Sequence, residues 1–396
     1  MKIVFVTLFG MSPKGTASVR VLPIAQSLAA LGHDVTIVLP PWTNPKDSGQ
    51  TYIDNGVKIV NVVVGKKMTA CSAAAITIRM LSAVLSSHPQ IIHCFKPKGF
   101  SGFVAMWTRF WQGIFRSKVR LFVDTDDWEG RGGWNDIMPY TGFQKRLFEF
   151  QEKWIPPRCD GITVASRALE TLMWSLGISQ EKILYLPNAV NNQEIPKPQV
   201  PREQLRQKFG LNDHPTVLLY TRFFEFDIKR LMAIIGELSK TIPSVKFLIV
   251  GKGFFGEEKK LASFVEERKL NDKVIIAGWV ESDMISSYLL CGDVAIYPMD
   301  DTLINRTKCP VKLTEIMKFG LPVVADCVGQ TGEYIRHGES GILIEPSDTG
   351  SFIKAVEHLV TNREMQVQIG KSARERMARK FSWQQWVEKL DNFYGM

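Results

Sequence analysis

The chain has 396 residues, a length that predicts two or three domains of about 150 residues each. Hydrophobic residues make up 45% of the chain and charged residues 22%, which excludes disorder, collagen and coiled coil as descriptions of the whole. The six cysteines are isolated and form no C-x-x-C pair, so the sequence indicates neither a zinc site nor a disulfide framework and favours the cytoplasm.

Charge is distributed unevenly along the chain. Residues 1–200 hold 22 basic and 14 acidic residues and the rest hold 27 and 26, so most of the net charge of +9 lies in the first half. No acidic residue occurs between Asp54 and Asp124, where ten basic ones do. Such a basic region favours an anionic partner, while the lack of a known nucleic-acid motif disfavours DNA and RNA.

Short apolar runs alternate with helical patterns over the first 190 residues. Strands that are apolar on both faces belong to parallel sheets covered by helices, so the alternation predicts a Rossmann-like, doubly wound domain over residues 1–190. The predicted strands are residues 2–8, 34–39, 90–95, 119–124 and 161–166.

A glycine-containing turn follows the first predicted strand. Gly15 and Thr16 begin a predicted helix that ends at Gly32, and free N–H groups at its amino end can meet a diphosphate or a sugar hydroxyl. The segment lacks the G-x-G-x-x-G pattern and an acidic residue about 20 positions later, which disfavours a nicotinamide oxidoreductase.

Residues 99–120 combine aromatic and basic side chains in a helical pattern. The aromatic residues are Phe103, Trp107, Phe110, Trp111 and Phe115. Two interpretations stay open: a helix at an anionic membrane surface, or a buried aromatic helix with a solvated basic end. The first interpretation predicts peripheral contact with the inner face of the membrane.

The alternation restarts beyond residue 200, and a second Rossmann-like domain is predicted over residues 203–378. Four prolines in residues 187–202 indicate a linker between the two domains. The predicted strands of the second domain are residues 216–221, 245–251, 273–278, 293–298 and 321–326.

The predicted fold is therefore α/β, with two facing doubly wound sheets. The carboxyl ends of their strands are expected to border a shared cleft, where such sheets bind ligands. A final helix in residues 379–396 has an apolar face and is expected to pack back on the first domain.

Three segments of the second half carry groups suited to a nucleotide diphosphate. Arg222 follows a predicted strand and Lys229 begins the next helix, so both cations can reach a diphosphate. Gly251 ends another strand, where a glycine turn either admits a ligand or simply connects strand to helix.

The strongest signal lies in residues 308–326. Pro310 suits the first turn of a helix and Gly320 suits its end. Lys312 lies near the amino end of this helix, where phosphate binds favourably. Glu315 follows one turn later and can accept hydrogen bonds from both hydroxyls of a ribose.

At these residues the sequence resembles the GT-B glycosyltransferases, and most closely the retaining glycosyltransferase family 4, or glycosyl transferases group 1. The resemblance covers nearly the whole chain in the expected order. The matching segments are GTASVR, GHDVTIV, IIHCF, GITVASRALETL, LPNAV, YTRFFEFDIK, IVGKG, VIIAGWV, CGDVAIYP, CPVKLTEIMKFGLPVVA and GEYIRHGESGILIEP.

The resemblance implies transfer of a sugar from a nucleotide-sugar donor to a glycan, lipid-linked or small-molecule acceptor, with retained anomeric configuration. It implies no cofactor and no bound metal. By position, Arg222 and Lys229 look like the pair that binds the donor diphosphate. Glu315 looks like the ribose-binding second glutamate of the E-x7-E motif, and Lys312 like the lysine of its K-x-x-E variant. Gly15 matches the glycine turn of the amino-terminal domain that faces the donor.

Two positions depart from the family pattern. Thr307 stands where the first glutamate of the motif is expected, and neither Asp300 nor Asp301 can be assigned to its place. Asp126 lies, by strand register, where the family often has a histidine. As a catalytic candidate it can accept the acceptor proton or stabilise positive charge on the sugar ring.

Three more residues are candidates for the acceptor or sugar side, namely Asp127, Arg20 and His93. His93 lies at a strand end, and its alternative interpretation is a histidine bonded within the core. The carboxylates of residues 124–129 are expected to be solvated or to pair with Arg20 and Arg131 and not to hold a metal.

Two other functions fit parts of the pattern. A sugar-nucleotide epimerase can have the same GT-B architecture, and a nucleotide-sugar-binding protein without turnover is compatible with Thr307 and Asp126. The intact phosphate-binding residues favour the transferase.

Overall fold

The computed structural model describes residues 1–65, 69–115, 118–191 and 197–396. They form two compact units: the first comprises Met1–Asn188, Thr307–Cys309 and Trp383–Met396, and the second Ala189–Arg306 and Pro310–Ser382. Part of the predicted linker, residues 192–196, lies outside the described residues. Three basic residues of the span between Asp54 and Asp124 also lie outside the described residues, namely Lys66, Lys67 and Arg116.

The first unit is built on an eight-stranded sheet with the order β3-β4-β2-β1-β5-β6-β7-β8. Its neighbouring strands are parallel except for the antiparallel pair β3 and β4. The strands are β1 (Lys2–Val6), β2 (Asp34–Leu39), β3 (Thr51–Asp54), β4 (Val57–Asn61), β5 (Ile91–Phe95), β6 (Arg120–Thr125), β7 (Gly161–Val164) and β8 (Ile183–Tyr185).

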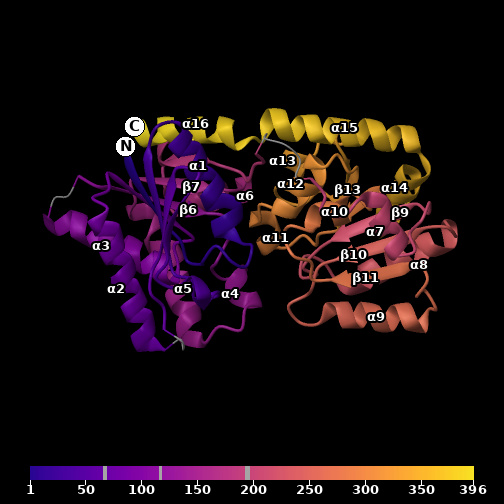
Figure 1. Ribbon diagram of the computed structural model, residues 1–396, viewed down its shortest axis with the longest axis horizontal. Coiled ribbons are helices and arrows are strands. Elements are labelled where there is room, and N and C mark those ends of the chain that lie inside the picture. Colours follow the sequence, from indigo (N-terminus) through magenta and orange to yellow (C-terminus); the bar gives the residue numbers. More distant parts are fainter. Residues whose placement is uncertain (66–68, 116–117, 192–196) are drawn as a thin grey trace. The chain divides into compact units, whose positions relative to one another are not determined.

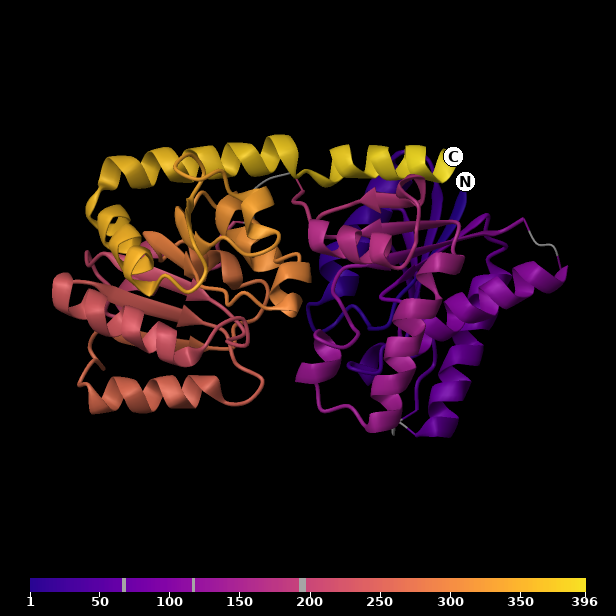
Figure 2. The same ribbon diagram turned by 180° about the vertical axis from the view of Figure 1, so that it is seen from behind.

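Helices cover both sides of this sheet. Figures 1 and 2 show α16 running beside α1, with α2, α3 and α5 on the other side of the unit. A π-helical turn, Ala17–Val21, precedes α1. The helices are α1 (Leu22–Ala30), α2 (Ala70–Ser86), α3 (Gly99–Phe115), α4 (Trp134–Ile137), α5 (Gly142–Trp154), α6 (Arg167–Ser175) and α16 (Trp383–Gly395). Short 3-10 turns occupy Pro45–Asp47, Pro156–Arg158 and Gln180–Lys182.

The second unit is built on a parallel six-stranded sheet with the order β11-β10-β9-β12-β13-β14. The strands are β9 (Thr216–Tyr220), β10 (Lys246–Val250), β11 (Val274–Gly278), β12 (Val294–Tyr297), β13 (Val323–Asp326) and β14 (Ile342–Ile344). The helices are α7 (Arg202–Lys208), α8 (Ile228–Thr241), α9 (Glu257–Glu267), α10 (Ile285–Leu289), α11 (Leu303–Thr307), α12 (Val311–Lys318), α13 (Thr331–Tyr334), α14 (Thr349–Thr361) and α15 (Arg363–Lys380). None of the helices within the described ranges combines the length and apolar character needed to cross a membrane.

Each sheet has one point where the chain changes its direction of winding. In the first unit β1 lies between β2 and β5, and in the second β9 lies between β10 and β12. Doubly wound sheets bind ligands beside such points, at the carboxyl ends of the strands. The residues that follow β1, β5 and β6, and those that follow β9 and β12, are therefore the ones to examine for a site.

The C-terminal helix α16 contributes to the core of the first unit. Val387 and Leu390 are fully buried on its inner face. The ring of Phe393 lies 5.6 Å from that of Phe122, and the ring of Tyr394 lies 4.8 Å from it. The last residues of the chain thus cover strand β6, which begins more than 250 positions earlier.

We expect Leu390→Ala to lower the free energy of unfolding by about 2 to 5 kcal/mol, because it leaves a cavity where a fully buried side chain was. Denaturant titration followed by circular dichroism measures the effect. The matched control is Glu388→Ala, an exposed position on the same helix, which should stay within about 0.5 kcal/mol of the wild type. Equal stability of the two variants would show that α16 does not belong to this core.

Candidate active site

Tyr220 links three of the predicted donor-binding residues of the second unit. It ends strand β9, and its hydroxyl is hydrogen-bonded to the carboxylate of Glu315. Burial, the Glu315 charge and this bond raise the pKa of Tyr220, whereas nearby Arg222 lowers it. The ammonium of Lys312 lies 4.6 Å from the centre of the Tyr220 ring. Arg222, Lys312 and Glu315 therefore gather around one tyrosine at the winding point of the sheet.

Local sequence explains how α12 presents its two members of this cluster. The helix begins directly after Pro310, which lacks an N–H group that a first turn would leave unpaired. Lys312 and Glu315 are three residues apart and therefore lie on the same side of the helix. Leu313 and Ile316 are fully buried and fix the opposite face against the unit. Tyr220 was not among the predicted site residues, although a polar ring at the end of an apolar strand is a usable signal.

The turn after β9 is held rigidly and positions Arg222. Thr221 Oγ1 accepts a hydrogen bond from the N–H of Phe223 (2.7 Å) and donates one to Glu225 (3.3 Å). The Arg222 guanidinium lies 5.9 Å from the ring centre of Phe254. Arg222 is half-buried, so part of its guanidinium stays accessible to a ligand.

Gly251 has a structural role that needs no ligand. Its φ is +129°, and a Cβ there would lie 1.9 Å from the carbonyl oxygen of Thr221. Its N–H already donates to the carbonyl of Gly278 (2.8 Å). Gly251 therefore lets neighbouring strand ends approach closely, and its donor-binding role stays a prediction.

Lys229 lies apart from the interactions that define the Tyr220 cluster. It is exposed in the first turn of α8, where its N–H donates to the capping Asp227 (2.9 Å). Within the described part of the chain its ammonium forms no ion pair. The neighbouring Arg230, which sequence analysis missed, makes two bonds of 2.6 and 2.8 Å to Asp326 at the end of β13. This pair fixes the start of α8 against the sheet.

Thr307, which replaces the first glutamate of the family motif, and the nearby Asp300 and Asp301 all form hydrogen bonds within the protein. Thr307 is fully buried, and its carbonyl accepts a hydrogen bond from Ser166 Oγ (2.7 Å). Asp300 accepts the N–H of Asp227 (2.7 Å), and Asp301 pairs with Arg306 at 2.5 and 2.6 Å. Both aspartates stabilise turns of the second unit.

A polar cluster in the first unit joins the turn after β1 to the end of β6. Asp126 accepts a hydrogen bond from Thr16 Oγ1 (3.1 Å), next to Gly15. Its second oxygen lies 2.9 Å from the ammonium of Lys96, which also contacts Asp127 at 2.7 Å. The predicted residues Gly15, Asp126 and Asp127 thus lie together, and Lys96 connects them.

Lys96 and Lys98 compensate the carboxylates that follow β6. Burial lowers the pKa of Lys96, but Asp126, Asp127 and Glu129 together raise it well above its ordinary value. Lys98 pairs with Glu129 as well. Together with Arg20, which pairs with Asp124, these two lysines are the partners of residues 124–129. Within the described residues no ion pair joins Arg131 to this segment. The pairing of the lysines is not evident from the sequence, because they follow a different strand, β5.

Arg20 and His93 belong to the core of the first unit, so their predicted place on the acceptor or sugar side is corrected. Both side chains are fully buried. Arg20 makes hydrogen bonds of 2.8 and 2.6 Å to Asp124. This pair agrees with the expectation that carboxylates of residues 124–129 pair with Arg20. His93 contacts the hydroxyls of Tyr394 (2.5 Å) and Thr163 (3.2 Å). The structure supports the alternative of a histidine bonded within the core.

Comparison with known protein families gives two matches along the chain. The family described as "Glycosyl transferases group 1" matches residues 201–376, and the "Glycosyl transferase 4-like domain" matches residues 15–189. Together these ranges cover most of both structural units.

Individual relatives are more distant. Alpha-D-kanosaminyltransferase of Streptomyces kanamyceticus is 26% identical over 49% of this chain and 48% of its own length. A GDP-mannose-dependent alpha-(1-6)-phosphatidylinositol monomannoside mannosyltransferase of Mycobacterium tuberculosis is 23% identical over 53% of this chain and 54% of its own. The chain thus spans about half the length of these curated relatives.

A solved structure matches the whole chain in fold. Sucrose-phosphate synthase from Thermosynechococcus elongatus superposes with a TM-score of 0.76 at 20% identity, covering 100% of this chain and 98% of the other. At this identity the likeness establishes the shared fold of two Rossmann-like domains.

The buried histidine predicts a specific pH dependence of stability. Burial, with the nearby Arg20 charge, lowers the pKa of His93 to about 3. In the unfolded chain the pKa returns to about 6.5, so between these values the unfolded state binds the extra proton. At pH 5 this linkage should destabilise the wild type by about 2 kcal/mol relative to pH 7. In His93→Gln that loss should be absent, which unfolding titrations of both proteins at the two pH values measure. Parallel pH profiles would contradict the neutral, buried histidine.

Proposed function

Because the chain belongs to the group 1 glycosyltransferases, which have the GT-B fold, we propose that it transfers a sugar from a nucleotide-sugar donor to an acceptor, with retained anomeric configuration. The observation that carries this proposal is the cluster around Tyr220. It combines cations for a diphosphate with a carboxylate for a ribose at the carboxyl end of β9. The mannosyltransferase relative is described as GDP-mannose-dependent, which supports a donor of this class.

The charges of the cluster suit the separation of charge in such a transfer. Breaking the anomeric bond leaves negative charge on the diphosphate, which Arg222 and Lys312 stabilise when they are fixed in advance. Lys229, exposed at the start of α8, adds a third cation when the donor is bound. Glu315, oriented by Tyr220, accepts hydrogen bonds from the ribose hydroxyls.

We propose that the first unit binds the acceptor and that Asp126 is its catalytic carboxylate. Its bonds to Thr16 and Lys96 hold it at the end of β6, where it can take the acceptor proton or stabilise the positive charge on the sugar ring. Asp127 shares Lys96 with it. Because lysines balance these carboxylates, the proposal includes no resident metal and no cofactor.

The acceptor is proposed to be a glycan or a lipid-linked, anionic molecule. The excess of basic residues in the first half supports this choice. The relative named for a phosphatidylinositol mannoside supports a lipid-linked acceptor. We further propose that the protein works in the cytoplasm, in peripheral contact with the inner face of the membrane.

Arg222→Ala and Lys229→Ala should each lower turnover by about 10² to 10³, because each removes one positive charge from the leaving diphosphate. Product formation from the correct donor and acceptor measures the effect. Lys240→Ala, at the exposed far end of α8, is the matched control and should keep wild-type turnover. Near-wild-type activity of both site variants would mean that the diphosphate binds elsewhere.

Glu315→Ala should weaken nucleotide binding by about 1.5 to 3 kcal/mol, because it removes a charged hydrogen-bond acceptor from the ribose. Calorimetry with UDP, GDP and ADP first identifies the base and then measures the loss. Glu267→Ala, an exposed carboxylate on α9, is the control. An unchanged dissociation constant for Glu315→Ala would remove this residue from the site. Product analysis with donor alone separates a transferase from an epimerase, which needs no acceptor.

A further inference from the structure

Helix α3 exposes an apolar stripe to solvent. Spacings of four, three and four residues place the stripe on one side of the helix, opposite the buried Val104, Ala105 and Thr108. These four exposed side chains of α3 contradict the interpretation of this helix as a buried aromatic helix. The members of the stripe, each between 38% and 59% exposed, are Phe103, Trp107, Phe110 and Ile114.

The neighbouring helix α2 also exposes apolar side chains. It packs against α3 and exposes Ile78 and Leu85, which are seven residues apart and so share one face. Neither helix contains an acidic residue, since the whole span between Asp54 and Asp124 has none. Exposed apolar patches of this kind mark interaction surfaces, and the lack of negative charge selects an anionic partner.

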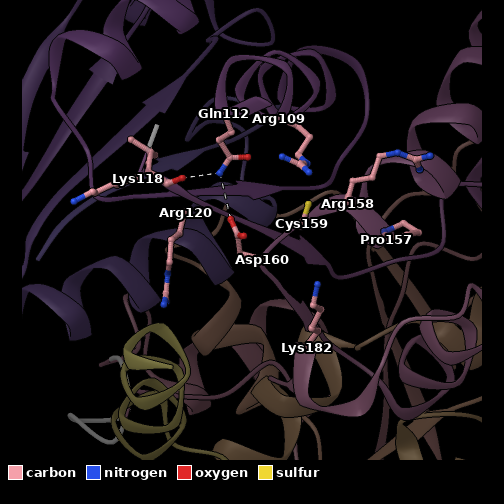
Figure 3. Close-up of a pocket in the computed structure, with 10 residues that line it drawn as sticks. Arg109, Gln112, Lys118, Arg120, Pro157, Arg158, Cys159, Asp160 and Lys182 are labelled. Carbon is pink, nitrogen blue, oxygen red and sulfur yellow. Dashed lines mark hydrogen bonds between the residues drawn. The ribbon is translucent and has the colours of Figure 1, made fainter. Parts of the chain in front are cut away.

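A basic hollow of about 430 Å³ lies at the end of α3 (Figure 3). It lies at the amino ends of β6 and β7. Asp126 follows the carboxyl end of β6, so the hollow and Asp126 lie at opposite ends of this strand. Figure 3 shows Arg109 and Lys182 pointing toward Cys159 from two sides. The basic residues that line the hollow are Arg109, Lys118, Arg120, Arg158 and Lys182.

The positive charge of the hollow is not neutralised by its one acidic residue. Asp160 accepts hydrogen bonds from the N–H of Leu121 (2.7 Å) and from the side-chain amide of Gln112 (3.3 Å). Both of these partners of its carboxylate are uncharged. Within the described residues, Arg109, Lys118 and Lys182 have no acidic partner. The hollow therefore offers uncompensated cations to an anion.

We propose that the α2–α3 face docks on a membrane and that the basic hollow binds the phosphate of an anionic lipid headgroup. The inference rests on the membrane contact proposed above and names the surface that makes it. The aromatic stripe suits the boundary between headgroups and acyl chains, where aromatic side chains are favoured. The cations of the hollow, at the end of the same helix, supply the attraction to negative headgroups. A phosphate of a soluble molecule has the same chemistry but does not account for the stripe.

Sedimentation with phosphatidylcholine vesicles, with and without phosphatidylglycerol, tests the proposal. The wild type should bind the anionic vesicles and release them at high salt. The double variant Arg109→Gln/Lys182→Gln should bind them about thirtyfold more weakly, which corresponds to about 1 kcal/mol for each basic residue near the surface. The double variant Trp107→Gln/Phe110→Gln should also lose binding to the vesicles, because it removes two aromatic side chains from the stripe.

Matched controls separate the surface from overall charge and hydrophobicity. Lys46→Gln/Lys58→Gln removes the same charge from exposed positions near β3 and β4, at the other edge of the sheet. Phe143→Gln removes an exposed aromatic residue from α5. Both control variants should bind anionic vesicles like the wild type, and circular dichroism should show that all variants are folded.

Three results would overturn the proposal. The first is equal binding to neutral and anionic vesicles, or to neither. The second is a loss in Lys46→Gln/Lys58→Gln as large as that in the hollow variant, which would indicate attraction by net charge alone. The third is tight binding of glycerol phosphate that depends on Arg109 and Lys182 while vesicle binding does not, which would assign the hollow to a soluble phosphate. Sugar transfer by the wild type without vesicles is measured separately, so the transferase and the docking surface can fail independently.

Discussion

Burying an arginine requires a carboxylate beside it, and each unit of this protein meets that requirement in the same way. Arg20 comes from the turn before α1, the first helix after β1, and pairs with Asp124 near the end of β6. Arg230 comes from α8, the first helix after β9, and pairs with Asp326 at the end of β13. An unpaired buried charge costs several kcal/mol. A shift of either helix would therefore be unfavourable, because it would separate the arginine from its aspartate.

These two pairs fix the strand edges on which the sites are built. Arg20 also donates to the carbonyl of Leu186 (2.8 Å) and to the side chain of Asn188 (3.1 Å), so one guanidinium joins the segments after β1, β6 and β8. Asp126 lies two residues beyond Asp124, so the bonds of Asp124 to Arg20 also hold the backbone near Asp126 in place. In the second unit Asp326 also accepts the N–H of Met299 (2.7 Å), which ties the end of β12 to the same edge.

The sequence predicted ten apolar strands, the helix of residues 308–326 and three residues that the structure gathers around Tyr220. Apolar runs and helix-end residues are local signals, and these three residues lie within short segments at strand or helix ends. Three strands of the first unit escaped prediction: β3 is largely exposed and polar, while β4 alternates and β8 has three residues. Lys96, Lys98 and Tyr220 escaped because their roles come from side chains on other segments. His93 and Arg20 looked like site residues until the structure showed Tyr394 and Asp124 around them.

The first unit is assembled from three segments, Met1–Asn188, Thr307–Cys309 and Trp383–Met396, and the two segments of the second unit lie between them in the sequence. The chain near the first and the last of the four crossings is held side by side, since the N–H of Val190 donates to the carbonyl of Phe381 (2.7 Å). A fragment cut after residue 190 would lack α16 and leave the rings of Phe122 and His93 without cover. The core of the first unit therefore depends on a segment that follows the second unit in the sequence.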